Sequence, residues 1–409
     1  MGLIAIVPLP EPGHINPTLV LYRQLVECGH EVAYVTTEEH APLFRRHNLP
    51  VVLGRQRPYT DISQIGFDIE LEPAVALVDS TIPYVSLWAW EQRWKVINLS
   101  ILFPRRYDPS VPPLGTELLP QSDALGRQRL EAAWAAEHRI NLERRSREVR
   151  RRAEAAGLGS EWIDERAALG AFIRFPELVL AAQQLDFQRS DTRDLFYAGP
   201  CVDLARVEPT HLLPSLPEGR PLVYCSFGTQ VHRYPQLPER VELVLAAARR
   251  LDAYHFVVVS SGTHSELPSN VTVVSEAPQL AMLRRAAVMI SHGGINAVSE
   301  AVCLGVPLVV MPFDIDQPGN AARVEHGGFG RRLAWEAATP ALLADTLQSV
   351  LGDEALAERV RALGVELREM LRQGQAAAAF AECWASYQRG GGRAAISGSI
   401  GAPEIALAE

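Results

Sequence analysis

The sequence is poor in cysteine, carries no excess of basic residues and has no long apolar run. Its 409 residues include 5 cysteines without a C-x-x-C pair, which is typical of buried free thiols in a reducing compartment. The net charge of −9 argues against nucleic acid as the main partner, because phosphate backbones are bound by clustered lysine and arginine. No stretch approaches the roughly 20 apolar residues of a transmembrane helix, and the N-terminus lacks the basic region of a signal peptide. We therefore expect a cytoplasmic protein with no integral membrane segment and no nucleic-acid partner.

Several catalytic signatures are absent as well. The sequence contains no G-x-S-x-G, H-E-x-x-H, Walker A or G-x-G-x-x-G motif. The His-Gly-Gly at 292–294 has the form of the oxyanion loop of α/β-hydrolases, but without G-x-S-x-G that interpretation is rejected.

Strand-like and helix-like segments alternate along the chain. An apolar run at 3–7, a helix-compatible segment at 15–28 and a second run at 31–36 predict a βαβ unit, and hence a parallel sheet with helices on both faces. Residues 199–221 have the proline-rich and glycine-rich composition of a linker, and the alternation restarts after them. Since a domain has about 150 residues, the length fits two or three domains. The predicted fold class is α/β, with two Rossmann-like doubly wound domains facing across a cleft that binds ligands.

The pattern also predicts boundaries. They are a first domain at 1–205, a linker at 206–220, a second domain at 221–388, whose final helix can pack back on the first domain, and a flexible tail at 389–409. Further strands are expected at 51–53, 74–78, 95–99, 178–181, 222–227, 255–259, 271–274, 287–290 and 308–311, and further helices at 122–156 and 236–251.

The segment SHGGINAVSEA, residues 291–301, joins a predicted strand directly to a predicted helix. Unpaired N–H groups and the helix dipole make such a helix N-terminus a binding site for anions. Gly293 and Gly294 would leave the backbone open to a diphosphate, and His292 can donate a further hydrogen bond. The alternative is that the two glycines only make a tight turn.

Polar residues nearby are suited to hydroxyl groups. Asn296 and Glu300 lie four residues apart and so share a face of the predicted helix. A carboxylate there would repel a phosphate, but it suits the vicinal diol of a ribose. The strand at 308–311 is followed by PFDIDQP, which places Asp316 and Gln317 at its carboxyl end. A carboxylate and an amide together can bind sugar hydroxyls, since each hydroxyl both donates and accepts.

Residues 277–324 resemble the donor-binding signature of UDP-dependent glycosyltransferases of the two-domain GT-B type, in particular the bacterial branch with the macrolide and zeaxanthin glucosyltransferases. The resemblance implies that the second domain binds the nucleotide-sugar donor and the first domain the acceptor. The implied donor contacts are His292, Gly293, Gly294 and Asn296 for the diphosphate, Glu300 for the ribose, Asp316 and Gln317 for the sugar, Gln279 for uracil, and Ser226 and Thr229 for a second phosphate and sugar contact.

The chain departs from the family pattern beside the nucleobase. Glu276 stands where the family often has tryptophan or tyrosine, and Ile295 and Ala297 stand where many plant members have tryptophan and serine. The donor is therefore either a UDP-sugar or a TDP-sugar. Asp314 and Asp316 also form a D-x-D, the metal-binding pattern of another transferase fold, but their place after a proline favours sugar binding. We expect no metal and no cofactor, the nucleotide sugar being a co-substrate.

Transfer to a hydroxyl needs a base, and the first domain offers a histidine. His14, in GHINP, lies where the first strand meets the first helix, and Asp79 follows the strand at 74–78, so both are expected in the cleft. An imidazole suits neutral pH, and a carboxylate on its other nitrogen would orient the ring. GHINP and LVDS also resemble the family's histidine loop and the segment with its paired aspartate. The alternatives are a helix-capping role for His14 and an N-cap role for Asp79.

The resemblance implies an inverting, metal-independent O-glycosyltransferase that transfers a hexose, with glucose as first choice, to a hydrophobic small molecule such as a polyketide, macrolide or carotenoid. The aromatic segment 82–90, together with Trp94, either lines the acceptor pocket or belongs to the core. A nucleotide-sugar epimerase of the same architecture and a non-catalytic nucleotide-sugar-binding partner are the alternative functions. We expect a monomer or weak dimer.

Overall fold

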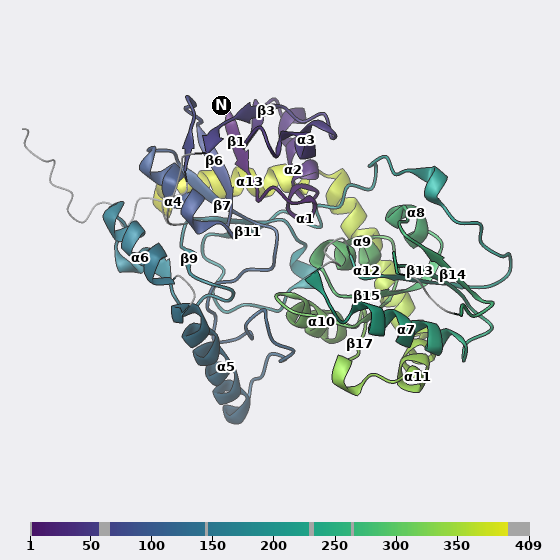
Figure 1. The fold of residues 1–409 in the computed structure, drawn as a ribbon. Helices are drawn as coiled ribbons and strands as arrows, with labels where there is room; N and C mark the ends of the chain where they lie inside the picture. Colours follow the sequence, from purple (N-terminus) through teal and green to yellow (C-terminus); the bar gives the residue numbers. More distant parts are fainter. Residues whose placement is uncertain (1, 57–65, 144–145, 229–232, 263–265, 392–409) are drawn as a thin grey trace, which may run out of the picture.

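The computed structural model describes residues 2–56, 66–143, 146–228, 233–262 and 266–391. The described chain forms two large parallel β-sheets, one from each half of the sequence, with helices packed around both (Figure 1). Two small antiparallel ribbons, β4 (Arg55–Gln56) with β5 (Phe67–Asp68) and β8 (Ile163–Asp164) with β9 (Phe172–Ile173), complete the sheet structure of these residues. The predicted α/β fold class with two doubly wound sheets is confirmed.

The first sheet has 7 strands in the order β11-β10-β7-β6-β1-β2-β3, and all its pairs are parallel. They are β1 (Ile4–Val7), β2 (Val32–Thr36), β3 (Val51–Leu53), β6 (Val75–Asp79), β7 (Val96–Ser100), β10 (Glu177–Val179) and β11 (Leu195–Tyr197). The central strands are buried along their whole length because helices cover both faces, and for that reason their sequences are continuous apolar runs. β1 and β6 lie side by side, with Val7 opposite Val78, so the loop after β1 begins next to Asp79.

The second sheet has 6 strands in the order β14-β13-β12-β15-β16-β17, again all parallel. They are β12 (Leu222–Ser226), β13 (His255–Val259), β14 (Val271–Val274), β15 (Ala286–Ser291), β16 (Leu308–Val310) and β17 (Gly330–Arg332). β12, β15 and β16 are neighbours in its centre, so the loops that follow them meet at one edge. Such an edge is where parallel sheets bind ligands.

The helices fill the connections between strands. In the first half they are α1 (Pro12–Ile15), α2 (Thr18–Glu27), α3 (Ala41–Arg45), α4 (Pro83–Glu91), α5 (Ala124–Glu143) and α6 (Ser146–Ala155). In the second half they are α7 (Leu237–Ala248), α8 (Gln279–Leu283), α9 (Ile295–Cys303), α10 (Gln317–His326), α11 (Pro340–Leu351), α12 (Glu354–Arg372) and α13 (Gln375–Ser386).

The last α-helix, α13, belongs to the second half of the sequence but lies along the first sheet (Figure 1). Phe380 and Cys383 are fully buried in a cluster with Ile4 and Leu25. The side chain of Gln24 fixes the start of the helix, since its Oε1 accepts hydrogen bonds from the backbone N–H groups of residues 376 and 377. The chain therefore crosses between the halves twice, once near residue 205 and once near residue 373.

Two predicted helices differ from the expectation. The helix expected at 15–28 is α2, which begins only at Thr18, because Pro17 at its N-cap has no N–H and separates it from the short α1 before it. This break lets His14 lie on a short turn at the end of the sheet. The helix expected at 122–156 is α5 and α6, and residues 144–145 between them lie outside the described part.

The aromatic segment after β6 belongs to the core. Trp88 is 1% exposed and Trp94 is 6% exposed, with their ring centroids 5.0 Å apart in an edge-to-face contact. Trp90 packs on Phe175 at 5.5 Å, and its Nε1 donates to the carbonyl of Ala156. Of the two interpretations of this segment, core packing is the one that the structure supports.

Candidate functional site

His14 and Asp79 meet where two neighbouring strands of the first sheet end. His14 is carried by α1, which follows β1, and Asp79 is the last residue of β6. His14 Nδ1 lies 2.7 Å from Asp79 Oδ2. The Asp79 side chain is fully buried, whereas 16% of the His14 side chain is exposed. The carboxylate therefore holds the ring at Nδ1 and leaves Nε2 as the nitrogen for another partner.

The second oxygen of Asp79 is held by the chain around it. Asp79 Oδ1 accepts hydrogen bonds from the backbone N–H and the hydroxyl of Thr81, at 2.9 and 2.6 Å. Asp79 Oδ2 also accepts from the backbone N–H of Leu9 at 3.2 Å. The N-cap of α4 is Ile82, so Asp79 does not cap that helix. These bonds fix the position of the Asp79 carboxylate independently of its contact with His14.

The pair shifts the pKa of both residues. Burial lowers the pKa of His14, but the hydrogen bond and charge of Asp79 outweigh it, so the pKa lies above its ordinary value. Burial raises the pKa of Asp79, but hydrogen bonds from His14 and Thr81 and the charge of His14 hold it below its ordinary value. The charges of Glu11 and of Asp316, which belongs to the second half, also raise the pKa of His14. Asp79 is thus a carboxylate at neutral pH that stabilises a proton on the ring.

In the second half, the His292 ring lies between two glycines. A Cβ on Gly228 would lie 2.7 Å from His292 Cε1, and one on Gly294 would lie 2.6 Å from His292 Nε2. Gly293 has a φ of +86°, and a Cβ there would lie 2.7 Å from Val310 Cγ1. The sequence predicts that Gly293 and Gly294 open the backbone to a ligand, and the structure adds that Gly294 makes room for the imidazole.

His292 is a neutral group beside an uncapped helix. Burial, and then the charge of Arg240, lowers the pKa of His292 to about 4, so the ring is uncharged at neutral pH. Its Nδ1 is buried and has no hydrogen-bond partner among the described residues. α9 begins directly after it with Gly294 as N-cap, which supplies no side-chain cap. An unpartnered buried nitrogen next to free N–H groups at a helix N-terminus is suited to an anion.

The first turn of α9 contacts the first half of the chain next to His14. Asn296 Nδ2 donates to the carbonyl oxygen of Gly13 at 2.8 Å. A second contact joins α10 to the loop after β7, where the backbone N–H of Gly319 donates to the carbonyl of Leu114 at 2.9 Å. These bonds bring the His14 turn and the helix N-termini of the second sheet together in one site.

Glu300 lies one turn further along α9 and is almost fully buried. It forms an ion pair with Arg206, in which Nη1 donates to Glu300 Oε1 and Nη2 donates to Glu300 Oε2. Gln279 Nε2 donates to Glu300 Oε2 at 2.6 Å, so two of the predicted site residues are in direct contact. Arg206 belongs to the connection between the halves, and the sequence analysis did not single it out.

Side-chain hydrogen bonds fix the conformation of the loop after β16. Gln317 Oε1 accepts from the backbone N–H of Phe313, and Gln317 Nε2 donates to the hydroxyl of Tyr234, each at 2.8 Å. Asp316 is 9% exposed and its Oδ2 accepts from Asn320 Nδ2 at 2.7 Å. Burial raises the pKa of Asp316 above its ordinary value. The amide of Gln317 thus shapes the loop that presents Asp316.

The remaining predicted residues follow β12. Ser226 is the buried last residue of this strand and pairs with Ser291 of β15, directly before His292. It therefore lies at the same edge of the sheet as the histidine. Thr229 lies outside the described residues.

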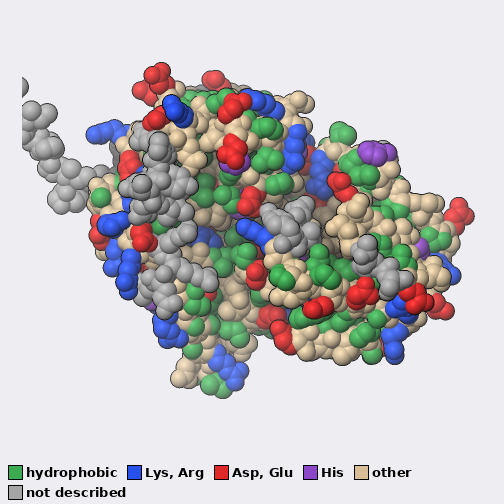
Figure 2. Space-filling model, viewed as in Figure 1, with side chains coloured by type: hydrophobic (Ala, Val, Ile, Leu, Met, Phe, Trp, Pro, Cys, Tyr) green, Lys and Arg blue, Asp and Glu red, His purple; other side chains and the backbone are tan. Residues whose placement is uncertain are grey.

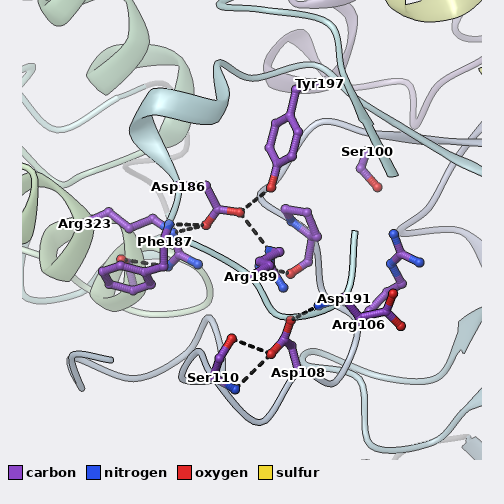
Figure 3. Close-up of polar contacts among 12 residues, drawn as sticks. Ser100, Arg106, Asp108, Ser110, Asp186, Phe187, Arg189, Asp191, Tyr197 and Arg323 are labelled. Carbon is purple, nitrogen blue, oxygen red and sulfur yellow. Dashed lines mark hydrogen bonds and ion pairs between the residues drawn. The ribbon is translucent and has the colours of Figure 1, made fainter. Parts of the chain in front are cut away.

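A buried ion-pair network that the sequence analysis missed connects the halves (Figure 3). Asp186 Oδ1 lies 2.7 Å from Arg323 Nε on α10, and Asp186 Oδ2 lies 2.9 Å from Arg189 Nε. The hydroxyl of Tyr197 donates to Asp186 Oδ2 at 2.6 Å. Burial raises the pKa of Asp186, but the two arginines outweigh it and lower the pKa to about 2. Because α10 starts at Gln317, the network fixes the helix that carries part of the site.

Asp186→Ala is expected to lower the free energy of unfolding by about 3–5 kcal/mol, because it leaves two buried arginines without their shared counter-ion. Asp191→Ala is a matched control, since its ion pair with Arg193 involves side chains that are 41% and 87% exposed, and exposed pairs contribute at most about 1 kcal/mol. Urea denaturation followed by circular dichroism measures both. Equal losses in the two variants would contradict the assigned importance of Asp186.

The surface and the described part of the chain add three observations. Acidic and basic side chains are interspersed over the face shown in Figure 2. Within the described ranges, no group of three or more histidine, cysteine, aspartate or glutamate side chains is arranged to hold a metal ion. In the same part of the chain, none of the helices combines the length and the apolar character needed to cross a membrane.

Comparison with known proteins identifies relatives of both halves. Residues 216–366 match the family model described as UDP-glucuronosyl and UDP-glucosyl transferase. The chain is 27% identical over 379 residues to the NDP-glycosyltransferase YjiC of Bacillus subtilis, covering 90% of this chain and 93% of that protein. It is 34% identical over 124 residues to the oleandomycin glycosyltransferase of Streptomyces antibioticus, covering 29% of each chain.

A solved structure has the same architecture. The crystal structure of the glycotransferase of kitacinnamycin superposes with a TM-score of 0.68 at 26% sequence identity, covering 92% of this chain and 97% of that chain. The likeness extends through both sheets, so it includes the half that lies outside the matched family model.

Proposed function

Because the chain belongs to the UDP-dependent glycosyltransferases of the GT-B type, we propose that it is an inverting O-glycosyltransferase that moves a hexose, glucose as first choice, from a UDP-sugar to a hydroxyl of a hydrophobic small molecule. The observation that carries this proposal is the His14–Asp79 pair at 2.7 Å, with its turn bonded to the N-terminus of α9. The proposed base and the proposed anion site thus lie next to each other, as glycosyl transfer between two substrates requires.

In the proposed mechanism His14 accepts the proton of the acceptor hydroxyl at Nε2. Asp79 holds the ring at Nδ1 and stabilises the imidazolium that forms. The acceptor oxygen attacks the anomeric carbon from the face opposite the nucleotide diphosphate. The bond between the anomeric carbon and the diphosphate oxygen breaks as the new glycosidic bond forms. The free N–H groups at the start of α9 and the neutral His292 stabilise the charge on the departing phosphate.

The donor contacts are proposed on the same geometry. His292, Gly293, Gly294 and Asn296 would bind the diphosphate, with Ser226 and Thr229 as a further phosphate and sugar contact. Glu300 would accept from the ribose and Gln279 would lie beside the base. Asp316 and Gln317 would bind the hexose. Gln317 uses one donor and one acceptor of its amide for the loop, and each end keeps a second hydrogen-bonding position.

We propose that residues 1–205 bind the acceptor and residues 221–388 bind the donor, with 206–220 as the linker between them. Fixed dipoles and N–H groups supply the charge stabilisation, so the reaction is proposed to need neither a metal nor a cofactor. The description of the matching family, which names UDP-glucosyl transferases, supports glucose. We propose a cytoplasmic monomer or weak dimer with a polyketide, macrolide, carotenoid or similar natural product as acceptor.

A donor-by-acceptor screen read by mass spectrometry tests the proposal. UDP-glucose, UDP-GlcNAc and TDP-deoxysugars are each combined with a panel of hydrophobic alcohols. The expected result is a product heavier by one hexose with UDP-glucose, formed together with UDP only when an alcohol is present. Release of UDP or interconversion of the sugar without any acceptor would favour an epimerase instead. Binding of nucleotide sugars without turnover on any alcohol would favour a non-catalytic binding protein.

Gly294→Ala is expected to raise the KM for the donor about tenfold with little change in stability, because the new methyl group displaces the His292 ring. Gly294 has a φ of −60°, so alanine causes no backbone strain. Gly352→Ala is a suitable control at another helix end, where the added Cβ would lie 3.2 Å from a single carbonyl oxygen. An unchanged donor KM in Gly294→Ala would show that the position of His292 has no part in donor binding.

A further inference from the structure

The Glu300 carboxylate has room for one more hydrogen bond. Its two oxygens together offer about four acceptor positions. Arg206 Nη1 contacts Oε1, Arg206 Nη2 contacts Oε2 at 3.2 Å, and Gln279 Nε2 contacts Oε2 at 2.6 Å. These bonds use both positions of Oε2 and one of Oε1. In the part of the chain that the structure describes, no other donor contacts this carboxylate, so a single position on Oε1 is left for a ligand.

Arg206 is fixed in this arrangement by a second carboxylate. Its Nε and Nη2 lie 3.2 and 3.0 Å from Glu208 Oε1. Glu208 is itself anchored, since its two oxygens accept from the backbone N–H groups of Leu280 and Ala281. The Arg206 side chain is only 20% exposed. Withdrawal of Arg206 from Glu300 would therefore break several charge-assisted bonds in a largely buried place.

Glu300 and Arg206 line the same small pocket between the halves. The pocket runs along α9 from Asn296 to Glu300, with Pro17 and Asp203 on the opposite side. A ligand that enters from the N-terminus of α9 thus meets the carboxylate and the guanidinium together. Arg206 is part of the site where the ribose is proposed to bind.

We propose that Arg206 sets the nucleotide selectivity by limiting Glu300 to one ribose hydroxyl, so that ribonucleotide and 2′-deoxyribonucleotide donors bind about equally well. This inference rests on the proposed function, in which Glu300 faces the ribose. With one acceptor position free, the second hydroxyl of a ribose gains no bond to the carboxylate. UDP-sugars and TDP-sugars then differ little at this contact, and the enzyme accepts both classes of donor.

The 2′-hydroxyl can be tested alone by comparing UDP with 2′-deoxy-UDP, which have the same base and diphosphate. Isothermal titration of the full chain gives the Kd of each nucleotide. For the wild type we expect the ratio of the Kd of 2′-deoxy-UDP to that of UDP to stay below about 3. In Arg206→Met the ratio is expected to rise to about 10, because Glu300 regains acceptor positions for the second hydroxyl.

Two further variants complete the experiment. Arg206→Lys keeps the positive charge but offers fewer bonds to Glu300, and an intermediate ratio is expected. Arg284→Met is the matched control, since this exposed arginine donates to the carbonyl of Leu204 in the same connection and does not contact Glu300. Its ratio should equal that of the wild type. Circular dichroism identifies a variant that has not folded. If one Arg206 variant does not fold, the Kd ratio of the other Arg206 variant tests the inference.

The outcomes separate the inference from the proposed function. A wild-type ratio of about 10 or more, or a ratio that is unchanged in both folded Arg206 variants, overturns the role of Arg206 while nucleotide binding stands. If the wild type binds neither UDP nor 2′-deoxy-UDP, the proposed function itself is wrong. A low wild-type ratio that rises in Arg206→Met and not in Arg284→Met supports the inference.

Discussion

Replacing His14 with alanine is expected to lower kcat by roughly 10²- to 10⁴-fold, the range of general base catalysis, while the Kd of UDP stays within about twofold. The imidazole is held at Nδ1 by Asp79 and is proposed to take the acceptor proton at Nε2. Without it the neutral alcohol must lose its proton to water. Steady-state kinetics with saturating donor measure the loss, and nucleotide titration reports on the donor site separately.

The alternative role for His14, capping of a helix, makes a different prediction. A capping residue would affect stability by about 0.5–2 kcal/mol and leave turnover of the folded protein nearly unchanged. His211→Ala is a control for the loss of an imidazole, because His211 is exposed in the connection between the halves. Turnover that is unchanged in His14→Ala across the panel of hydrophobic alcohols would exclude the proposed base.

The central strands of both sheets could be predicted because they are buried on both faces, and the segment at 255–259 has the predicted boundaries. The edge strands β3 and β14 also have their predicted boundaries, 51–53 and 271–274, because each is a short run of mostly apolar residues. The edge strands β11 and β17 were missed, and β17 shows why, since its sequence Gly-Arg-Arg has no apolar run. β17 therefore depends on its pairing with β16 more than on its own side chains.

In the candidate site, too, some residues could be predicted from the sequence and others could not. His14, His292 and Glu300 lie in short local motifs at the ends of strands and helices, which a single sequence displays. Their partners are distant in the sequence. Glu300 is 94 residues from Arg206, and Asp186 is 137 residues from Arg323, so no periodicity or motif connects them. Buried ion pairs of this kind are determined by how the two sheets pack.

Asp79→Asn is expected to lower kcat by roughly 10² or more and to shift the acidic limb of the pH profile of kcat/KM to lower pH. Asparagine cannot both accept from the His14 ring and accept from Thr81, so the ring loses its orientation. It also removes the charge that, against burial, holds the pKa of His14 above its ordinary value. Since a base works in its neutral form, activity in the wild type is lost as pH falls through that raised pKa.

In the Asp79→Asn variant the pKa of His14 falls, because burial then acts without the opposing carboxylate. The residual activity should therefore persist to lower pH than in the wild type, although the rate is smaller at every pH. Thr81→Val is the matched control, since it removes the hydroxyl bonded to Asp79 Oδ1 and leaves the bond between Oδ2 and His14. A lower rate with an unchanged inflection would contradict the assigned effect of the Asp79 charge on the pKa of His14.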